Sequence, residues 1–252
     1  MRLGRVIWSD FLKMKRTPIL YIHIILPCVG IIVFSLFAAL SDIDTTSKAA
    51  GYFQVMGFTF PIIIGTVCAM VCEQEFKAGN GYNLLTSVSS KILNGISKLL
   101  ILAMLGFIST IVAIFGFGIM LCFILRKDIF SFGFYFKATN ILFASNFALY
   151  ILHLFFSLRF GKNTSIGFGI VGSLVSALLV SSLGAGLWYF VPYAWGSQFA
   201  SIWTAISADK SLVSSYQSDI ALGITFSAAL TTIILLVYML WFSHWEGKKA
   251  HD

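Results

Sequence analysis

The chain has 252 residues, of which 58% are hydrophobic and 11% are charged, and its formal net charge is +7. A soluble domain carries about 25% charged residues, so this composition leaves too few charges to cover a water-facing surface and excludes a soluble globular protein. The four cysteines lie inside apolar runs and form neither a disulfide framework nor, with any nearby histidine, a zinc site.

Residues 2–16 predict an amphipathic helix in the membrane interface. Apolar positions 3, 6, 7, 11 and 14 share one side of a helical wheel, and four basic positions, 2, 5, 13 and 16, share the other. The basic side is suited to anionic lipid headgroups. Asp10 interrupts the apolar side, and pairing with a cation on a neighbouring helix is one explanation that the sequence leaves open.

Six apolar runs follow, each long enough to cross a bilayer as a helix. The predicted spans cover about 19–40, 52–72, 99–125, 138–158, 166–190 and 222–242. We therefore predict an all-α membrane protein with six transmembrane helices in a single domain over residues 1–252. None of these spans contains Asp, Glu, Lys or Arg, which argues against an ion-coupled carrier. For His23 and His153, a hydrogen-bonded structural role is favoured over a proton relay.

An even number of spans places both ends of the chain on one side of the membrane. That side carries 12 of the 17 lysines and arginines. The remaining ones are Lys48, Arg126, Lys127, Lys137 and Lys210. Because cytoplasmic loops are enriched in these residues, we expect both termini in the cytoplasm. The basic balance then reflects topology and anionic lipid rather than nucleic acid.

The stretch from Glu73 to Lys98 is too polar to cross a bilayer and too long for a tight turn. It contains two acids, two glycines, a short amphipathic piece and a Ser/Thr cluster. A solvated linker and a short helix that docks a protein partner are both possible. Its length and its polarity on both sides favour the docking helix.

An aromatic segment, Val191–Trp203, follows the fifth predicted span on the outer side of the membrane. Two interpretations are compatible with each other here. The rings form an aromatic belt at the interface, or the segment is a short hairpin or helix that gates a lateral path for an amphipathic substrate.

The order of these elements resembles the permease subunits of type-2 ABC exporters. A basic interfacial helix and two spans precede a loop that opens with Glu73 and contains G-x-x-L-L-T-S-x-S-S-K; four more spans follow, with the aromatic segment before the last. Within these permeases, the runs L-K-M-K-R-T and V-P-Y-A-W-G are similar to those of lantibiotic immunity and bacitracin-resistance transporters.

The resemblance implies an elbow helix over residues 2–16, a coupling helix near Gly81–Lys91, and neither a catalytic nor a metal site. The residues implied in ATPase coupling are Glu73, Glu75, Gly81, Tyr82, Leu84, Leu85 and Lys91. Those implied in the substrate path are Trp188, Tyr193, Trp195 and Trp203.

The resemblance also implies a bacterial cell membrane as the location, and it implies partners. These are a cytoplasmic ABC ATPase dimer, which would bind ATP and Mg²⁺, and a second permease that is identical to this chain or different; the chain itself needs no cofactor. The expected substrate is a cationic peptide antibiotic removed from the outer leaflet, although the outer side of this chain is formally neutral. A permease for a lipid or small amphipathic drug, and a membrane scaffold that transports nothing, are the alternatives.

Overall fold

The structure is a computed structural model that describes residues 2–79, 81, 84, 90–124 and 130–247. Over these residues the chain forms helices and turns with no strand, and six helices are long and apolar enough to cross a membrane. They span Pro18–Leu40, Thr45–Lys77, Lys91–Phe123, Phe132–Phe160, Lys162–Leu179 and Lys210–His244. The predicted all-α membrane fold is therefore confirmed.

The first three long helices begin at residues that suit a helix N-terminus. Helix α1 (Arg2–Met14) leads into α2 (Pro18–Leu40), which opens with proline at the position where a missing N–H matters least. Asp44 caps α3 (Thr45–Lys77) by accepting a hydrogen bond from the Ser47 amide (2.9 Å). Ser90 caps α5 (Lys91–Ile119), which continues as a π-helical turn, Met120–Ile124.

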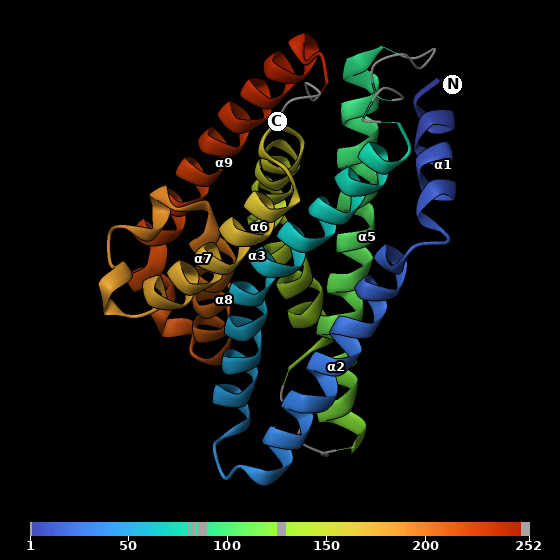
Figure 1. Ribbon diagram of the computed structural model, residues 1–252. Coiled ribbons are helices and arrows are strands. Elements are labelled where there is room, and N and C mark those ends of the chain that lie inside the picture. Colours follow the sequence, from blue (N-terminus) through green and yellow to red (C-terminus); the bar gives the residue numbers. More distant parts are fainter. Residues whose placement is uncertain (1, 80, 82–83, 85–89, 125–129, 248–252) are drawn as a thin grey trace.

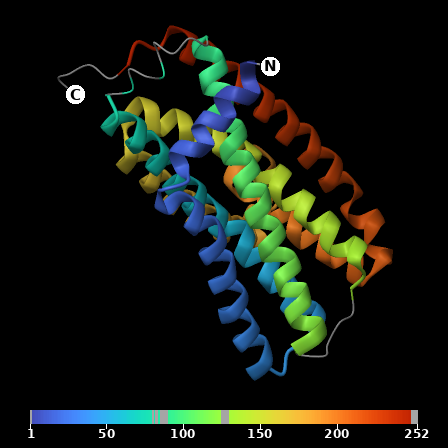
Figure 2. The same cartoon turned by 90° about the vertical axis from the view of Figure 1, so that its right-hand side faces the viewer.

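The remaining helices complete a bundle with α3 and α6 (Phe132–Phe160) at its centre (Figure 1). Helix α7 (Lys162–Leu179) packs along α3, while α2 lies beside α5 and α1 rests on the first turns of α5. Helix α9 (Val213–His244) lies on the opposite side of the bundle from α2 (Figure 2). The start of α1 and the end of α9 lie at the same end of the bundle, which we call the terminal end.

Helix α7 ends at Leu179, eleven residues before the predicted end of the fifth span at 190. Two 3₁₀ turns follow, Ser182–Gly184 and Trp188–Phe190, with Gly186 at φ +74° between them. Serine hydroxyls that bond to nearby backbone and glycine with positive φ both favour a turn over a helix. Leucines and aromatic residues continue through this stretch, so its hydropathy does not reveal the break.

The aromatic segment forms a helix, α8 (Pro192–Ala208), which packs among α3, α6, α7 and α9. At about 25 Å it is shorter than the hydrocarbon core of a bilayer. The backbones of α3 and α8 meet at Gly57, where an added Cβ would lie 2.5 Å from the Ser197 backbone. The same residue of α8 contacts α7, because the hydroxyls of Ser176 and Ser197 lie 2.9 Å apart. A helix this closely packed is part of the bundle.

Candidate functional site

The two acids that open the predicted coupling loop have different environments. Glu73 lies near the surface at the end of α3, and its carboxylate accepts a hydrogen bond from Lys162 (2.7 Å) and pairs with Lys77 (3.1 Å). Glu75 is 2% exposed, and its Oε1 lies 2.5 Å from the ammonium of Lys98. Glu73 therefore ties α3 to α7 at the surface, and Glu75 belongs to a buried group of charges.

This buried ion cluster consists of Asp10, Lys13, Glu75 and Lys98. The Lys98 ammonium donates to both Glu75 and Asp10 Oδ1 (2.7 Å), and Ser97 donates to Asp10 Oδ2 (2.6 Å). Asp10 thus does pair with a cation on a neighbouring helix. Two carboxylates and two ammonium groups balance, which offsets part of the cost of removing charges from water. The cluster attaches α1 to α3 and α5.

Lys13 completes the ion cluster at its edge, with its ammonium 3.0 Å from Glu75 and 3.5 Å from Asp10. Burial acts to lower the pKa of Lys13, but the attraction of the two carboxylates is together larger and holds this pKa above its usual value. Lys13 therefore remains charged at physiological pH.

Several residues expected in ATPase coupling surround the same place. The Gly81 amide donates to the Glu75 carbonyl (3.2 Å), and Gly81 has φ +75°. Leu84 is 4% exposed, and its carbonyl accepts a hydrogen bond from Asn94 (2.8 Å). Tyr82, Leu85 and much of the predicted coupling helix Gly81–Lys91 lie outside the described residues, so that helix stays a prediction.

Lys91, the last residue of that group, bonds to the end of the chain. Its ammonium donates to the carbonyl oxygen of Trp245 (3.1 Å), just beyond α9. The Trp245 indole is 7% exposed and stacks on Phe242 at 5.6 Å between ring centroids. Glu75, Gly81, Leu84 and Lys91 thus meet at the terminal end, where α3, α5 and α9 converge.

Two of the four residues expected along a substrate path are core residues. Trp188 is 3% exposed and packs on Gly223 of α9, where an added Cβ would lie 2.3 Å from its ring. Trp195 is 1% exposed, and its indole N–H donates to the Tyr189 carbonyl (2.9 Å). Neither indole lines the pocket described below.

The third residue, Tyr193, contacts one of the two histidines that the sequence singled out. The Tyr193 hydroxyl lies 3.4 Å from His153 Nε2, and Ser165 Oγ lies 3.0 Å from His153 Nδ1. Ser165 also donates to the Gly65 carbonyl (2.9 Å). Both ring nitrogens therefore have neutral partners on α7 and α8, an arrangement that supports the structural role for His153.

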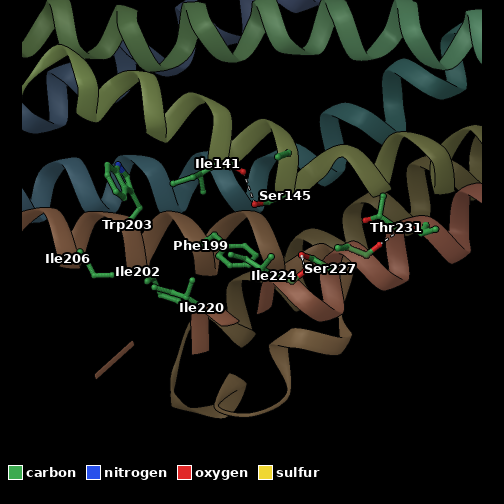
Figure 3. A pocket seen from close by; sticks show the side chains of 13 residues that line it. Ile141, Ser145, Phe199, Ile202, Trp203, Ile206, Ile220, Ile224, Ser227 and Thr231 are labelled. Carbon is green, nitrogen blue, oxygen red and sulfur yellow. Dashed lines mark hydrogen bonds between the residues drawn. The ribbon is translucent and has the colours of Figure 1, made fainter. Parts of the chain in front are cut away.

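The fourth residue, Trp203, lines a pocket of about 700 Å³ between α6, α8 and α9 (Figure 3). Its indole N–H donates to the Phe134 carbonyl (3.3 Å), and the Lys137 ammonium lies 5.3 Å from the centre of its ring. The other residues of the lining are Ile141, Ala144, Ser145, Phe199, Ile202, Ile206, Ile220, Ile224, Ser227, Ala228, Thr231 and Thr232. The lining thus contains neither an acidic nor a basic side chain.

Sequence reasoning missed the contribution of α9 to this pocket. Ile220, Ile224, Ser227, Ala228 and Thr231 recur at spacings of three and four, so they share one face of the helix. Small and hydroxyl-bearing residues on one face of an otherwise aliphatic helix were the available signal. That face is not distinguishable by sequence from a helix-packing face.

Six helices that are long and apolar enough to cross a membrane define the class of the protein: it is a multi-pass membrane protein. A family model described as ABC-2 family transporter protein matches residues 6–176, more than half of the chain, and the chain belongs to that family. Its members are membrane components of transporters that work with an ABC ATPase and are not themselves that ATPase. No curated protein and no solved structure matches the chain.

Proposed function

We propose that this chain is the permease subunit of an ABC exporter that protects its host from a peptide antibiotic of the lantibiotic or bacitracin type. Family membership supports the general role in transport. The pocket between α6, α8 and α9 is the observation that supports an amphipathic substrate reached from the membrane.

The chemistry of the pocket favours apolar ligands. Its volume of about 700 Å³ lies in the range of sites for small organic ligands. Its hydroxyl groups are partly occupied within their own helices: Ser145 donates to Ile141 (2.6 Å) and Thr232 donates to Ala228 (2.8 Å). Binding must then come mainly from apolar contact with isoleucines and two aromatic rings.

This volume also limits what enters. A whole lantibiotic is larger than the pocket, so a peptide substrate would insert one apolar or aromatic segment and leave its charged part outside. A lipid chain or a small amphipathic drug would fit more completely. The same volume therefore favours the second candidate function, export of such a molecule.

The charge distribution supports an orientation for this activity. With the lysine-rich terminal end in the cytoplasm, the end of the bundle that holds Gly81, Leu84 and Lys91 lies on the side of the membrane where the ATPase binds. The Trp203 end of the pocket then lies toward the outer leaflet, where a peptide antibiotic arrives.

The test compares two adjacent alanines on α9. Ala228 lines the pocket and Ala229 does not, while both are exposed. We expect Ala228→Trp to fill the pocket and abolish resistance to the transported peptide, and Ala229→Trp to retain it. The measurement is the inhibitory concentration of a lantibiotic panel and bacitracin in hosts that express the complete transporter.

Assembly and ATP hydrolysis of each purified complex provide the control. If hosts with and without an assembled, ATP-hydrolysing transporter are equally sensitive to every peptide, the antibiotic proposal is rejected. Stimulation of the same complex by lipids or drugs, lost in Ala228→Trp alone, would then support the second candidate.

A further inference from the structure

Helix α9 connects the two regions described above. Its residues between Ile220 and Thr232 line the pocket, and Trp245, directly after its end, reaches the base of the predicted coupling loop. Among its residues only Gly223, Tyr238 and Phe242 are buried. A helix with few buried contacts along its length is held mainly at those points, so the nature of its attachments determines what can move it.

The attachment at the terminal end consists of Phe76, Gly81, Lys91 and Trp245, which we call the α9 anchor. The Trp245 ring meets the edge of Phe76 at 6.4 Å between centroids, and the Lys91 ammonium bonds to the Trp245 carbonyl (3.1 Å). A Cβ on Gly81 would lie 3.2 Å from the Trp245 ring, which is tighter than most Cβ contacts, and the φ of +75° at this residue also favours glycine. The indole of Trp245 thus contacts the end of α3 and the loop. The backbone carbonyl of the same residue binds the start of α5.

The loop side of the α9 anchor is itself held in place. Gly81 bonds to the Glu75 carbonyl (3.2 Å), and the Glu75 carboxylate belongs to the ion cluster. Phe242 packs on Gly95 of α5, where an added Cβ would lie 2.8 Å from its ring. Displacement of the loop base would therefore be transmitted to Trp245 through packed side chains and hydrogen bonds.

We propose that Trp245 is a positioning residue that links the base of the coupling loop to α9, so that nucleotide-driven movement of the loop shifts the α9 wall of the pocket. From Thr232 at the pocket to Trp245 the helix extends about 20 Å, at about 1.5 Å per residue. This inference rests on the proposed function only in taking the loop as the ATPase contact and the pocket as the substrate site.

The chain offers a matched control for Trp245. Trp241 lies one helical turn earlier and packs its ring against Phe155 of α6, with 4.8 Å between centroids. Its ring also lies 6.0 Å from that of Trp245, so Trp241→Ala removes one neighbour of Trp245 but leaves Phe76, Gly81 and Lys91 in place. Trp245→Phe keeps an aromatic ring that Trp245→Ala removes, while both variants keep the backbone carbonyl that Lys91 binds.

The first measurement needs no substrate. In the complex with its ATPase, and with the half-buried Cys28 and Cys122 replaced by serine, Thr231→Cys reports access to the pocket through its rate of maleimide labelling. We expect a nonhydrolysable ATP analogue to change this rate by about fivefold or more in the otherwise unchanged chain. The change should persist with Trp241→Ala and Trp245→Phe and disappear with Trp245→Ala.

The second measurement separates this inference from the proposed function. Substrate-stimulated ATP hydrolysis should lose its stimulation in Trp245→Ala, while the concentration of substrate giving half-maximal binding stays unchanged. If no peptide or lipid stimulates any variant but the labelling pattern is as expected, the proposed function fails and the link through Trp245 stands. An equal nucleotide response in Trp241→Ala and Trp245→Ala, or no response in the unchanged chain, overturns the link.

Discussion

Lys98 of α5 donates a hydrogen bond from its buried ammonium to Asp10 of α1 (2.7 Å), across 88 positions of sequence. The two side chains are 7% and 5% exposed. This bond joins helix α1 to the bundle at the level of Glu75. Because α1 has few other charged contacts with the bundle among the described residues, we expect its position to depend on this pair.

We predict that Lys98→Met destabilises the protein by about 3–5 kcal/mol, because it leaves two buried carboxylates with only the edge cation Lys13. Thermal unfolding in detergent measures the effect. Lys162→Met removes a cation from the exposed carboxylate of Glu73 and serves as the control, with an expected unchanged midpoint. The double variant Lys98→Met with Asp10→Asn should recover part of the loss; equal midpoints for the two single variants would contradict a buried role for Lys98.

Alanine substitutions of the two tryptophans in α8 should have different effects, one on stability and the other on substrate binding. Trp195→Ala should cost about 3–5 kcal/mol, because its side chain is 1% exposed and its N–H donates to Tyr189. Trp203→Ala should cost less stability than Trp195→Ala, because Trp203 is only partly buried, and should weaken substrate binding, because its ring lines the pocket. Unfolding midpoints and ligand titration of both purified variants check the pair, and the opposite pattern would remove Trp203 from the substrate site.

The topology can be tested with two exposed positions at opposite ends of the bundle. Ser47 lies in the first turn of α3, and Ala78 directly follows the last turn of the same helix. With the terminal end in the cytoplasm, a membrane-impermeant maleimide on intact cells should label Ser47→Cys and spare Ala78→Cys. Permeabilised cells should show labelling of both. Labelling of Ala78→Cys alone in intact cells would invert the orientation.

The cap of α3 should make a defined contribution to acid sensitivity. The hydrogen bond from the Ser47 amide is the main cause that lowers the pKa of Asp44 below its usual value. A carboxylate with a depressed pKa stabilises the fold above its unfolded pKa, and this stability is lost as the pH falls through its folded pKa. Asp44→Asn keeps a capping side chain that does not titrate.

We therefore expect Asp44→Asn to match the unchanged chain near neutral pH and to lose less of its thermal midpoint below pH ~4. Thermal scans of the two proteins across this pH range give the difference between their unfolding midpoints. The titration of all other acids cancels in this difference. If the two plots of midpoint against pH run parallel, the Asp44 cap does not contribute to the acid sensitivity of the protein.

The sequence alone was sufficient for the membrane class, for most spans and for the amphipathic first helix. These properties depend on the local balance of apolar and charged residues, which the bilayer imposes on every segment separately. The early end of α7 at Leu179 was not predictable in this way. The break depends on Ser181 and Gly186, and the apolar residues around them keep the hydropathy high.

Only the tertiary structure showed which distant residues meet. Glu75 and Lys98 lie just outside the apolar runs and appear in sequence as loop charges, yet α3 and α5 extend far enough to bury them against Asp10. Trp195 and Trp203 look alike in sequence, and the packing of α8 alone places one in the core and the other at the pocket. Hydropathy records the preference of each residue for lipid or water, whereas a site is defined by side chains from several helices, and their proximity arises only when the helices pack.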